Sequence, residues 1–307
     1  MILRPFVCLL AVWLASAQEL TLRPTLQAGD SFQLEYTRII EDSRRPQANG
    51  RIRAFIAVHV LEANPKGFLL RWTSGASSVD NPEIVRNPVA AAAASALKDH
   101  ALEVQLGPDG QYLGLRNQAA TAARLQAAMD KMLESLGRQL TDPAQRQSVE
   151  GLVRRLMSPQ VLLGQATRDV QTYFALNGIA IAAGKPAVQA IEQPAPFGGG
   201  TLAATYTLAL DSMDAHSARL SSATAYDSEE LSHLASRFFA QLTAGSQAPA
   251  APPALEMADS AAYTYNRAYG LMSDILVRRR LTGAGGMNRL EGWDVKLMRH
   301  PGEDDRQ

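Results

Sequence analysis

One short stretch, DSEELSHLASRFF beginning at Asp227, has the spacing that chemistry most often uses. Glu229 and Glu230 precede His233 by four and three residues, so one helical face can present a carboxylate beside an imidazole. Such a pair could hold a metal ion or act as a general base, which would suit a hydrolase. A zinc peptidase, however, needs two histidines with the glutamate between them. No second histidine is near, and acidic residues also favour a helix amino end. We therefore favour capping over catalysis.

A run of three glycines, Gly198 to Gly200, is the nearest approach to a phosphate-binding loop. Such loops offer backbone N–H groups at the start of a helix and usually add a lysine. Here the residues from Thr201 onward alternate between polar and apolar, which is strand periodicity, and no Lys-Ser or Lys-Thr follows. We expect a corner of a sheet at this point, with a strand leaving it.

The remaining histidines are scattered at His59, His100, His216 and His300. His59 lies in an apolar strand pattern, where we expect a satisfied, partly buried ring. His216 is close to Asp214, but no G-x-S-x-G elbow supplies a serine nucleophile. The sequence therefore nominates no catalytic, cofactor-binding or metal-binding residue. We expect a protein that is not an enzyme and carries no cofactor.

The amino terminus predicts export. Arg4 precedes an apolar run from Phe6 to Leu14, and small residues follow at Ala15 and Ala17. This is the layout of a signal peptide over residues 1–17 with cleavage after Ala17. The run is shorter than the roughly 20 residues of a membrane span. We expect a periplasmic or secreted protein with no transmembrane anchor after cleavage. The single cysteine, Cys8, would leave with the signal, so disulfides and thiolate sites are excluded from the mature chain.

Charge excludes one class of partner. Lys plus Arg and Asp plus Glu number 30 each, whereas nucleic-acid binding usually needs a basic face. Arginines cluster only locally, at Arg44–Arg45 and at Arg278 to Arg280. Three successive arginines on a strand alternate between its faces, and we expect them on a solvated edge strand.

Hydrophobic periodicity predicts strands in the first and last thirds of the chain. Apolar residues alternate with polar ones over residues 29–42, 51–63 and 67–75, and the short links between them require an antiparallel meander. A helix is expected over 89–97 and a hairpin over 101–117. Strands return over 178–226, and at least two more follow a proline- and alanine-rich loop at about 245–254.

Between these strands, helical spacing predicts a helical insert at about 117–177. Leucines and methionines from Leu125 to Leu140 form one stripe, a second helix begins near Pro143, and a third begins at Ser158–Pro159 and ends at Asn177–Gly178. A further helix is expected over 228–242, with Asp227 as its cap. Residues 18–307 are expected to form a single α+β domain.

The large aromatic side chains can be interpreted in two ways. They could line an apolar cavity or fill the core, and we favour the core because aromatic rings contribute much of its burial. The residues concerned are Trp72, Trp293, Tyr263, Tyr265 and Tyr269.

The order of elements, a meander, a helical cover and a second meander, resembles the lipoprotein-carrier half-barrels of the bacterial envelope. The segments GDSFQLEYTR and LGPDGQYLGLRN are also similar to segments of uncharacterised exported bacterial proteins. No motif of the half-barrel family matches residue by residue. The resemblance implies an α+β fold with a curved antiparallel sheet, a helical insert packed against it, and a non-catalytic protein that binds an apolar ligand or lipid. An envelope protein with a structural or protein-interaction role is the alternative, and a hydrolase comes third.

Overall fold

Eleven antiparallel strands form one sheet that dominates the computed structural model. The structure describes residues 19–81, 100–139, 142–143, 146–147, 150–151, 154, 158–195, 201–242 and 254–300. The strands of the large sheet are β2 (Ser31–Asp42), β3 (Gly50–Asn64), β4 (Gly67–Val79), β5 (Ala101–Leu106), β6 (Tyr112–Leu115), β8 (Ala187–Pro194), β9 (Thr201–Met213), β10 (Ser217–Tyr226), β11 (Leu255–Asn266), β12 (Leu271–Gly283) and β13 (Met287–Arg299).

The sheet consists of two meanders joined by the first and last of its strands. Its order is β6-β5-β4-β3-β2-β13-β12-β11-β10-β9-β8. Strands β2 to β6 form one meander and β8 to β13 the other, so neighbours in sequence are neighbours in space, as short links require. The join is the antiparallel pair β2–β13, in which Arg38 lies opposite Trp293 and Tyr36 opposite Val295.

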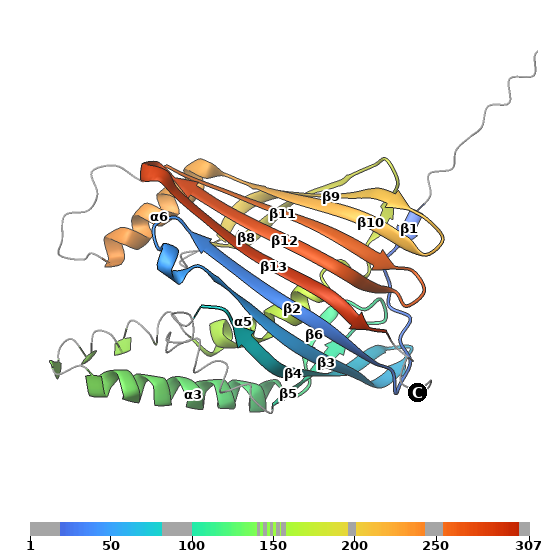
Figure 1. Cartoon of the computed structure of the whole chain (residues 1–307), viewed down its shortest axis with the longest axis horizontal. Helices are drawn as coiled ribbons and strands as arrows, with labels where there is room; N and C mark the ends of the chain where they lie inside the picture. The colour runs from blue at the N-terminus through green and yellow to red at the C-terminus, as the bar shows by residue number, and fades with distance from the viewer. Residues whose placement is uncertain are drawn as a thin grey trace, which may run out of the picture.

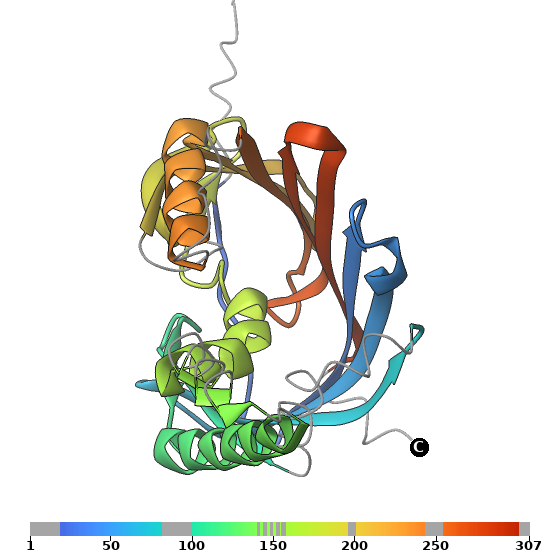
Figure 2. The ribbon, with the colours of Figure 1, turned by 90° about the vertical axis from the view of Figure 1, so that its left-hand side faces the viewer.

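The sheet curves strongly and does not close. Its edge strands β6 and β8 have no further strand partner within the described residues. Figure 2 shows the strands bending into a trough-shaped sheet, with helices on its concave side. The predicted fold class, α+β with a curved antiparallel sheet and helices packed against it, is confirmed.

The described residues include three helices: α3 (Gln118–Gln139), α5 (Pro159–Tyr173) and α6 (Ser228–Leu242). Helix α5 begins where predicted, because the Ser158 hydroxyl accepts a hydrogen bond from the N–H of Val161 and Pro159 occupies the first turn. Helix α3 packs on α5 through a small cluster that includes Met129, Leu133 and Leu162. Helix α6 covers the other half of the trough, over β8 to β11.

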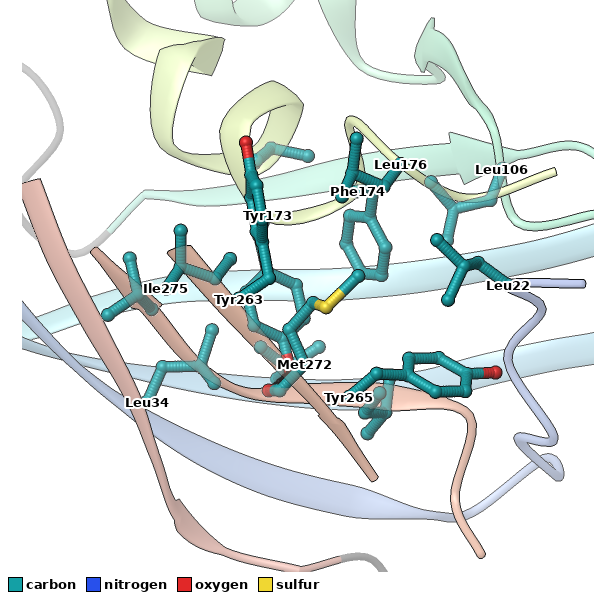
Figure 3. Close-up of a cluster of buried hydrophobic side chains, with 14 of the residues drawn as sticks. Leu22, Leu34, Leu106, Tyr173, Phe174, Leu176, Tyr263, Tyr265, Met272 and Ile275 are labelled. Atoms are coloured by element: carbon teal, nitrogen blue, oxygen red, sulfur yellow. Dashed lines mark hydrogen bonds between the residues drawn. The ribbon is translucent and has the colours of Figure 1, made fainter. Parts of the chain in front are cut away.

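The main core lies where the end of α5 meets the floor of the trough. Tyr173 and Phe174 pack edge to face, with ring centroids 5.0 Å apart, and their rings contact Phe32 of β2 and Trp72 of β4. The Tyr173 hydroxyl donates a hydrogen bond to the carbonyl of Met272, 2.9 Å away, so its polar tip is satisfied although buried. In Figure 3 the rings of Tyr173 and Phe174 face Tyr263, Met272 and Ile275 of the second meander. The core therefore ties the two meanders together through α5.

An amino-terminal strap, residues 19–28, crosses one end of the trough. Its strand β1 (Glu19–Thr21) pairs with β7 (Ala180–Ala182) in a separate small sheet. Arg23 donates its backbone N–H to the Tyr265 hydroxyl and its side-chain Nε–H to the carbonyl of Pro108, so the strap bonds to both meanders. The side chains of Leu22 and Leu26, which belong to the strap, are buried.

Most predicted elements are present where the structure describes them. The carboxyl-terminal segment, in which at least two strands were expected, holds three, β11 to β13, because a turn at residues 267–270 divides the first predicted segment. Helix α5 ends at Tyr173, before the predicted stop at Asn177–Gly178. Strand β12, which carries the three arginines, is not an edge strand, since β11 and β13 flank it. The signal segment, the helix expected over 89–97, most of the second helix of the insert, Gly198 to Gly200 and nearly all of the 245–254 loop lie outside the described residues.

The strap gives a test of this arrangement. Gly270 has φ +65°, and a methyl group there would overlap the carbonyl oxygen of Arg23; Gly184 has φ +72° but nothing within 4 Å. Gly184→Ala should lower the free energy of unfolding by about 1–2 kcal/mol, the cost of the left-handed backbone alone. Gly270→Ala should lower it by a further 1–3 kcal/mol or so, as overpacking does. Urea unfolding of the two variants measures this difference, and equal losses would contradict the close approach of the strap.

Candidate functional site

The concave face of the sheet carries a row of charged side chains among apolar ones. We call it the inner-face polar strip, and it consists of Tyr226, Asp259, Arg279, Glu291 and Arg38. The register places Asp259 opposite Arg279 and Arg279 opposite Glu291, so the three lie side by side on β11, β12 and β13. Strand alternation puts them on the same face as the buried Tyr263, Ile275 and Val295. Charged residues on an inner face need partners, and the pairings show which of them have one.

Arg279 forms a bidentate ion pair with Asp259. Its Nε and Nη2 donate to the two carboxylate oxygens of Asp259 at 2.8 and 2.6 Å, and the Tyr226 hydroxyl donates to the same carboxylate at 2.7 Å. Hydrogen bonding to Asp259 raises the pKa of Arg279 further above its ordinary range, while burial raises the pKa of Tyr226. This bidentate pair corrects the prediction of a solvated edge. Arg279 points inward to Asp259, and Arg278 points to Asp294 on the opposite face.

Glu291 serves two arginines unequally. Its Oε1 accepts hydrogen bonds from Nε of Arg289, at 3.1 Å, and from Nη2 of the same side chain. The nearest approach of Arg38 to Glu291 is 3.8 Å, between Nη2 and Oε2, which is an ion pair but too long for a hydrogen bond. Arg38 is therefore attracted to Glu291 without being hydrogen-bonded to it.

Two buried donors at the Arg38 end of the strip have no acceptor among the described residues. Nε of Arg38 and Nε1 of Trp293 are both inaccessible and lack a hydrogen-bond partner within the described part of the chain. The two residues are direct cross-strand neighbours on β2 and β13. Buried donors are nearly always paired in proteins, so two adjacent exceptions mark this position on the floor of the trough.

Helix α5 brings a carboxyl group to the same region. Asp169 is hydrogen-bonded to the Tyr36 hydroxyl and interacts electrostatically with Arg168 and Arg38. Burial raises the pKa of Asp169, and the hydrogen bond with Tyr36 and the two arginines oppose that rise. Burial also raises the pKa of Tyr36. Tyr36, Arg38 and Asp169 therefore connect helix α5 to strand β2.

Hydroxyl groups add further polar side chains to the inner face of the second meander. Ser222 Oγ lies 3.4 Å from the Tyr263 hydroxyl, and Tyr206 hydrogen-bonds to both of these residues. Burial raises the pKa of Tyr263 to about 12. All three hydroxyls are neutral at physiological pH and can donate or accept.

Apolar residues that are only partly buried surround the strip. Ile40 and Ile52 lie on the β2–β3 side, and Ala261, Val277 and Leu281 lie on β11 and β12. Arg38 and Arg279 keep 34% and 32% of their side-chain surface exposed, so solvent reaches the strip between the helices. The concave face is thus an accessible surface with both apolar and charged parts. A separate open surface pocket between the strap and β4, lined by Arg23, Leu26 and Phe68, lies away from it.

The carboxylates and imidazole singled out by sequence do not form one unit. Glu230 accepts a hydrogen bond from the N–H of Ala203 on β9, at 3.1 Å, and its own N–H donates to the Asp227 carboxylate at 2.8 Å. Glu229 lies 3.9 Å from His233 on an exposed face of α6. The capping prediction is confirmed, and Glu230 is used to hold α6 to the sheet.

The other histidines are dispersed as expected. His100 shares a hydrogen bond with the Thr121 hydroxyl, and His300 stacks on Tyr269. His59 is exposed on β3, so the expectation of a partly buried ring was wrong: the residue falls on the outer phase of the alternation. No cluster of three or more potential metal ligands occurs among the described residues.

The aromatic residues are core residues, as predicted. Trp72, Trp293, Tyr263 and Tyr265 are buried, and Tyr269 packs partly buried against them. Sequence analysis did not identify Arg38, Arg279, Glu291 or Asp259 as a group. Their common signal is a charge at an inward phase of a strand, which becomes visible only when the phase of each strand is known.

Comparisons with known proteins identify no family. No protein-family model matches the chain, and no curated protein matches it. Among solved structures, the chain is similar to one described as "Lipid-protein interactions in lipovitellin", with a TM-score of 0.37 and 8% identity. The match covers 88% of this chain and 25% of that chain, and a similarity of this degree carries no functional argument.

In the part of the chain that the structure describes, every helix is too short or too polar to cross a bilayer.

The raised pKa of Asp169 predicts a pH dependence. Between the ordinary aspartate pKa of about 3.9 and its own higher value, the folded state binds more protons than the unfolded state. Stability must therefore fall as pH rises through that interval and stay lowered above it. Asp169→Asn cannot ionise, so the difference in unfolding free energy, variant minus wild type, should grow as pH rises. Urea unfolding of both proteins from pH 3.5 upward measures it, and parallel stability curves would contradict the burial of this carboxyl.

The role of Glu230 can be separated from that of His233. Glu230→Ala should lower the free energy of unfolding by about 1 kcal/mol, because it removes the hydrogen bond to Ala203. His233→Ala, at an exposed position, should change it by less than about 0.5 kcal/mol. Thermal unfolding of the two variants provides the comparison. Equal effects would mean that the two side chains act as a pair.

Proposed function

We propose that the protein is a non-catalytic component of the bacterial envelope that binds an apolar or amphipathic ligand on the concave face of its sheet. The observation that carries the proposal is the partial exposure of Ile40, Ile52, Val277 and Leu281 beside the inner-face polar strip. Ligand sites in proteins are mostly apolar and concave, with a few polar groups to orient the ligand.

Export and architecture support this proposal. Residues 1–17 have the layout of a signal peptide, which would deliver the chain to the periplasm or the outside. The open curved sheet with helices over its concave side is the arrangement that the resemblance to the lipoprotein-carrier half-barrels implies. In the mature form the protein would be free of cysteine, which suits a fold held by its core alone.

A role in protein interaction is the second candidate, and the sheet edges favour it. Val188 on edge strand β8 and Leu113 on edge strand β6 are each 66% exposed. Unpaired edges with apolar side chains can accept a strand from another chain. This role would use the rims of the trough rather than its floor.

Two neighbouring alanines of β11 test the ligand proposal. Ala261 is half-buried on the inner face and Ala262 is exposed on the outer face. Ala261→Trp should place a large ring on the inner face and weaken binding of palmitate and hexadecanol by about tenfold or more, as loss of roughly 1.4 kcal/mol implies. Ala262→Trp should leave binding within about twofold of wild type.

Native mass spectrometry and isothermal titration below the micellar concentration measure this binding. Circular dichroism confirms that both variants fold. Failure of the wild-type protein to bind either compound would refute the ligand proposal. Equal effects of the two substitutions would move the site away from the concave face.

A further inference from the structure

We infer that Arg38 and Trp293 form a subsite for the anionic head group of an amphipathic ligand. This inference deepens the proposed function and rests on it. The two residues oppose each other across the β2–β13 pair on the concave face. Cross-strand neighbours have Cβ atoms about 5 Å apart, so a small group bound between the two side chains would contact both.

The chemistry of the two donors specifies the missing partner. The indole Nε1–H of Trp293 can only donate, and the guanidinium of Arg38 offers Nε–H and no acceptor. Trp293 is only 8% exposed, yet its Nε1 has no partner among the described residues, and the same holds for Nε of Arg38. These two buried donors lie on neighbouring residues, and an anionic group with two or more oxygen atoms can accept from both. A carboxylate or phosphate provides this geometry, and arginine binds both through its planar fork.

The acidic residues nearby do not fill this role. Glu291 is hydrogen-bonded to Arg289 and comes no closer than 3.8 Å to Arg38. Asp169 is hydrogen-bonded to the Tyr36 hydroxyl. Asp259 accepts from both Arg279 and Tyr226. Arg38 is thus the arginine of the strip that has no carboxylate hydrogen bond.

Apolar residues around the subsite define the rest of the ligand. Ile52 lies opposite Arg38 on β3, and Val277 lies opposite Trp293 on β12. Both are partly exposed on the same face. A head group held by Arg38 and Trp293 would therefore place an alkyl chain along these side chains. The ligand class that fits is an amphiphile with a carboxylate or phosphate head and an aliphatic tail.

The test compares compounds that share a sixteen-carbon chain and differ in the head group. Palmitate carries a carboxylate, hexadecyl phosphate a phosphate, and hexadecanol a neutral hydroxyl. Isothermal titration below the micellar concentration gives the affinity of each for wild type and variants. Sodium acetate and inorganic phosphate, which lack the chain, show whether the head group binds alone.

Wild type should bind one or both anionic compounds more tightly than hexadecanol. Arg38→Gln should weaken that binding about 10- to 100-fold, because a charge-assisted hydrogen bond is lost. Trp293→Phe should weaken it about 3- to 10-fold, as loss of a neutral hydrogen bond does. Arg53→Gln, which removes the same charge from an exposed position on the outer face of β3, should have no effect beyond twofold. Unchanged hexadecanol binding would show that the variants keep their fold.

The possible failures are distinct. If all three compounds bind equally and Arg38→Gln changes nothing, the anionic subsite is refuted while the proposed ligand function stands. If no compound binds, both the anionic subsite and the proposed ligand function are refuted. If acetate or phosphate binds as tightly as its long-chain counterpart, the subsite takes a free anion, and the amphiphile assignment is wrong. Preference for palmitate over hexadecyl phosphate, or the reverse, identifies the head group.

Discussion

The pairing of β2 with β13 is the constraint on which the rest of the structure depends. These strands come from opposite ends of the chain, and their hydrogen bonds turn two separate meanders into one sheet of eleven strands. Closing a loop of that length has an entropic cost that local contacts cannot meet. It is offset by the α5 rings, which contact both meanders, and by the strap, which bonds to both.

Curvature follows from that pairing and creates a concave face with two different halves. The half beneath the end of α5 is filled with aromatic and aliphatic side chains and forms an ordinary core. The other half, between α5 and α6, carries the inner-face polar strip and keeps partial exposure. Burying charges is unfavourable unless they are matched. Arg279 and Asp259 satisfy that rule, whereas Arg38 satisfies it only in part, which is why the proposed head-group subsite is placed there.

Periodicity predicted most of the fold because the signals are local. Alternation in GDSFQLEYTR fixes the phase of β2, and Ser158–Pro159 marks the start of α5 through a hydroxyl cap and a residue without an N–H. The curvature of the sheet was predicted only from a resemblance in the order of elements. The candidate site could not be predicted in this way. Arg278 to Arg280 were expected on a solvated edge, because nothing local shows that β13 will cover the second side of β12.

The sequence by itself determined which segments are strands and helices, which side of each strand is apolar, and that a chain with one cysteine folds without an internal disulfide. These properties depend on residues a few positions apart. Only the tertiary structure decided which strands are neighbours, and therefore which charges meet. Asp259 and Arg279 lie 20 residues apart, whereas Arg38 and Trp293 lie 255 apart, and both relationships arise from strand register. The physical reason is that a side chain's partner on a sheet is set by pairing across strands, which the local pattern of residues does not encode.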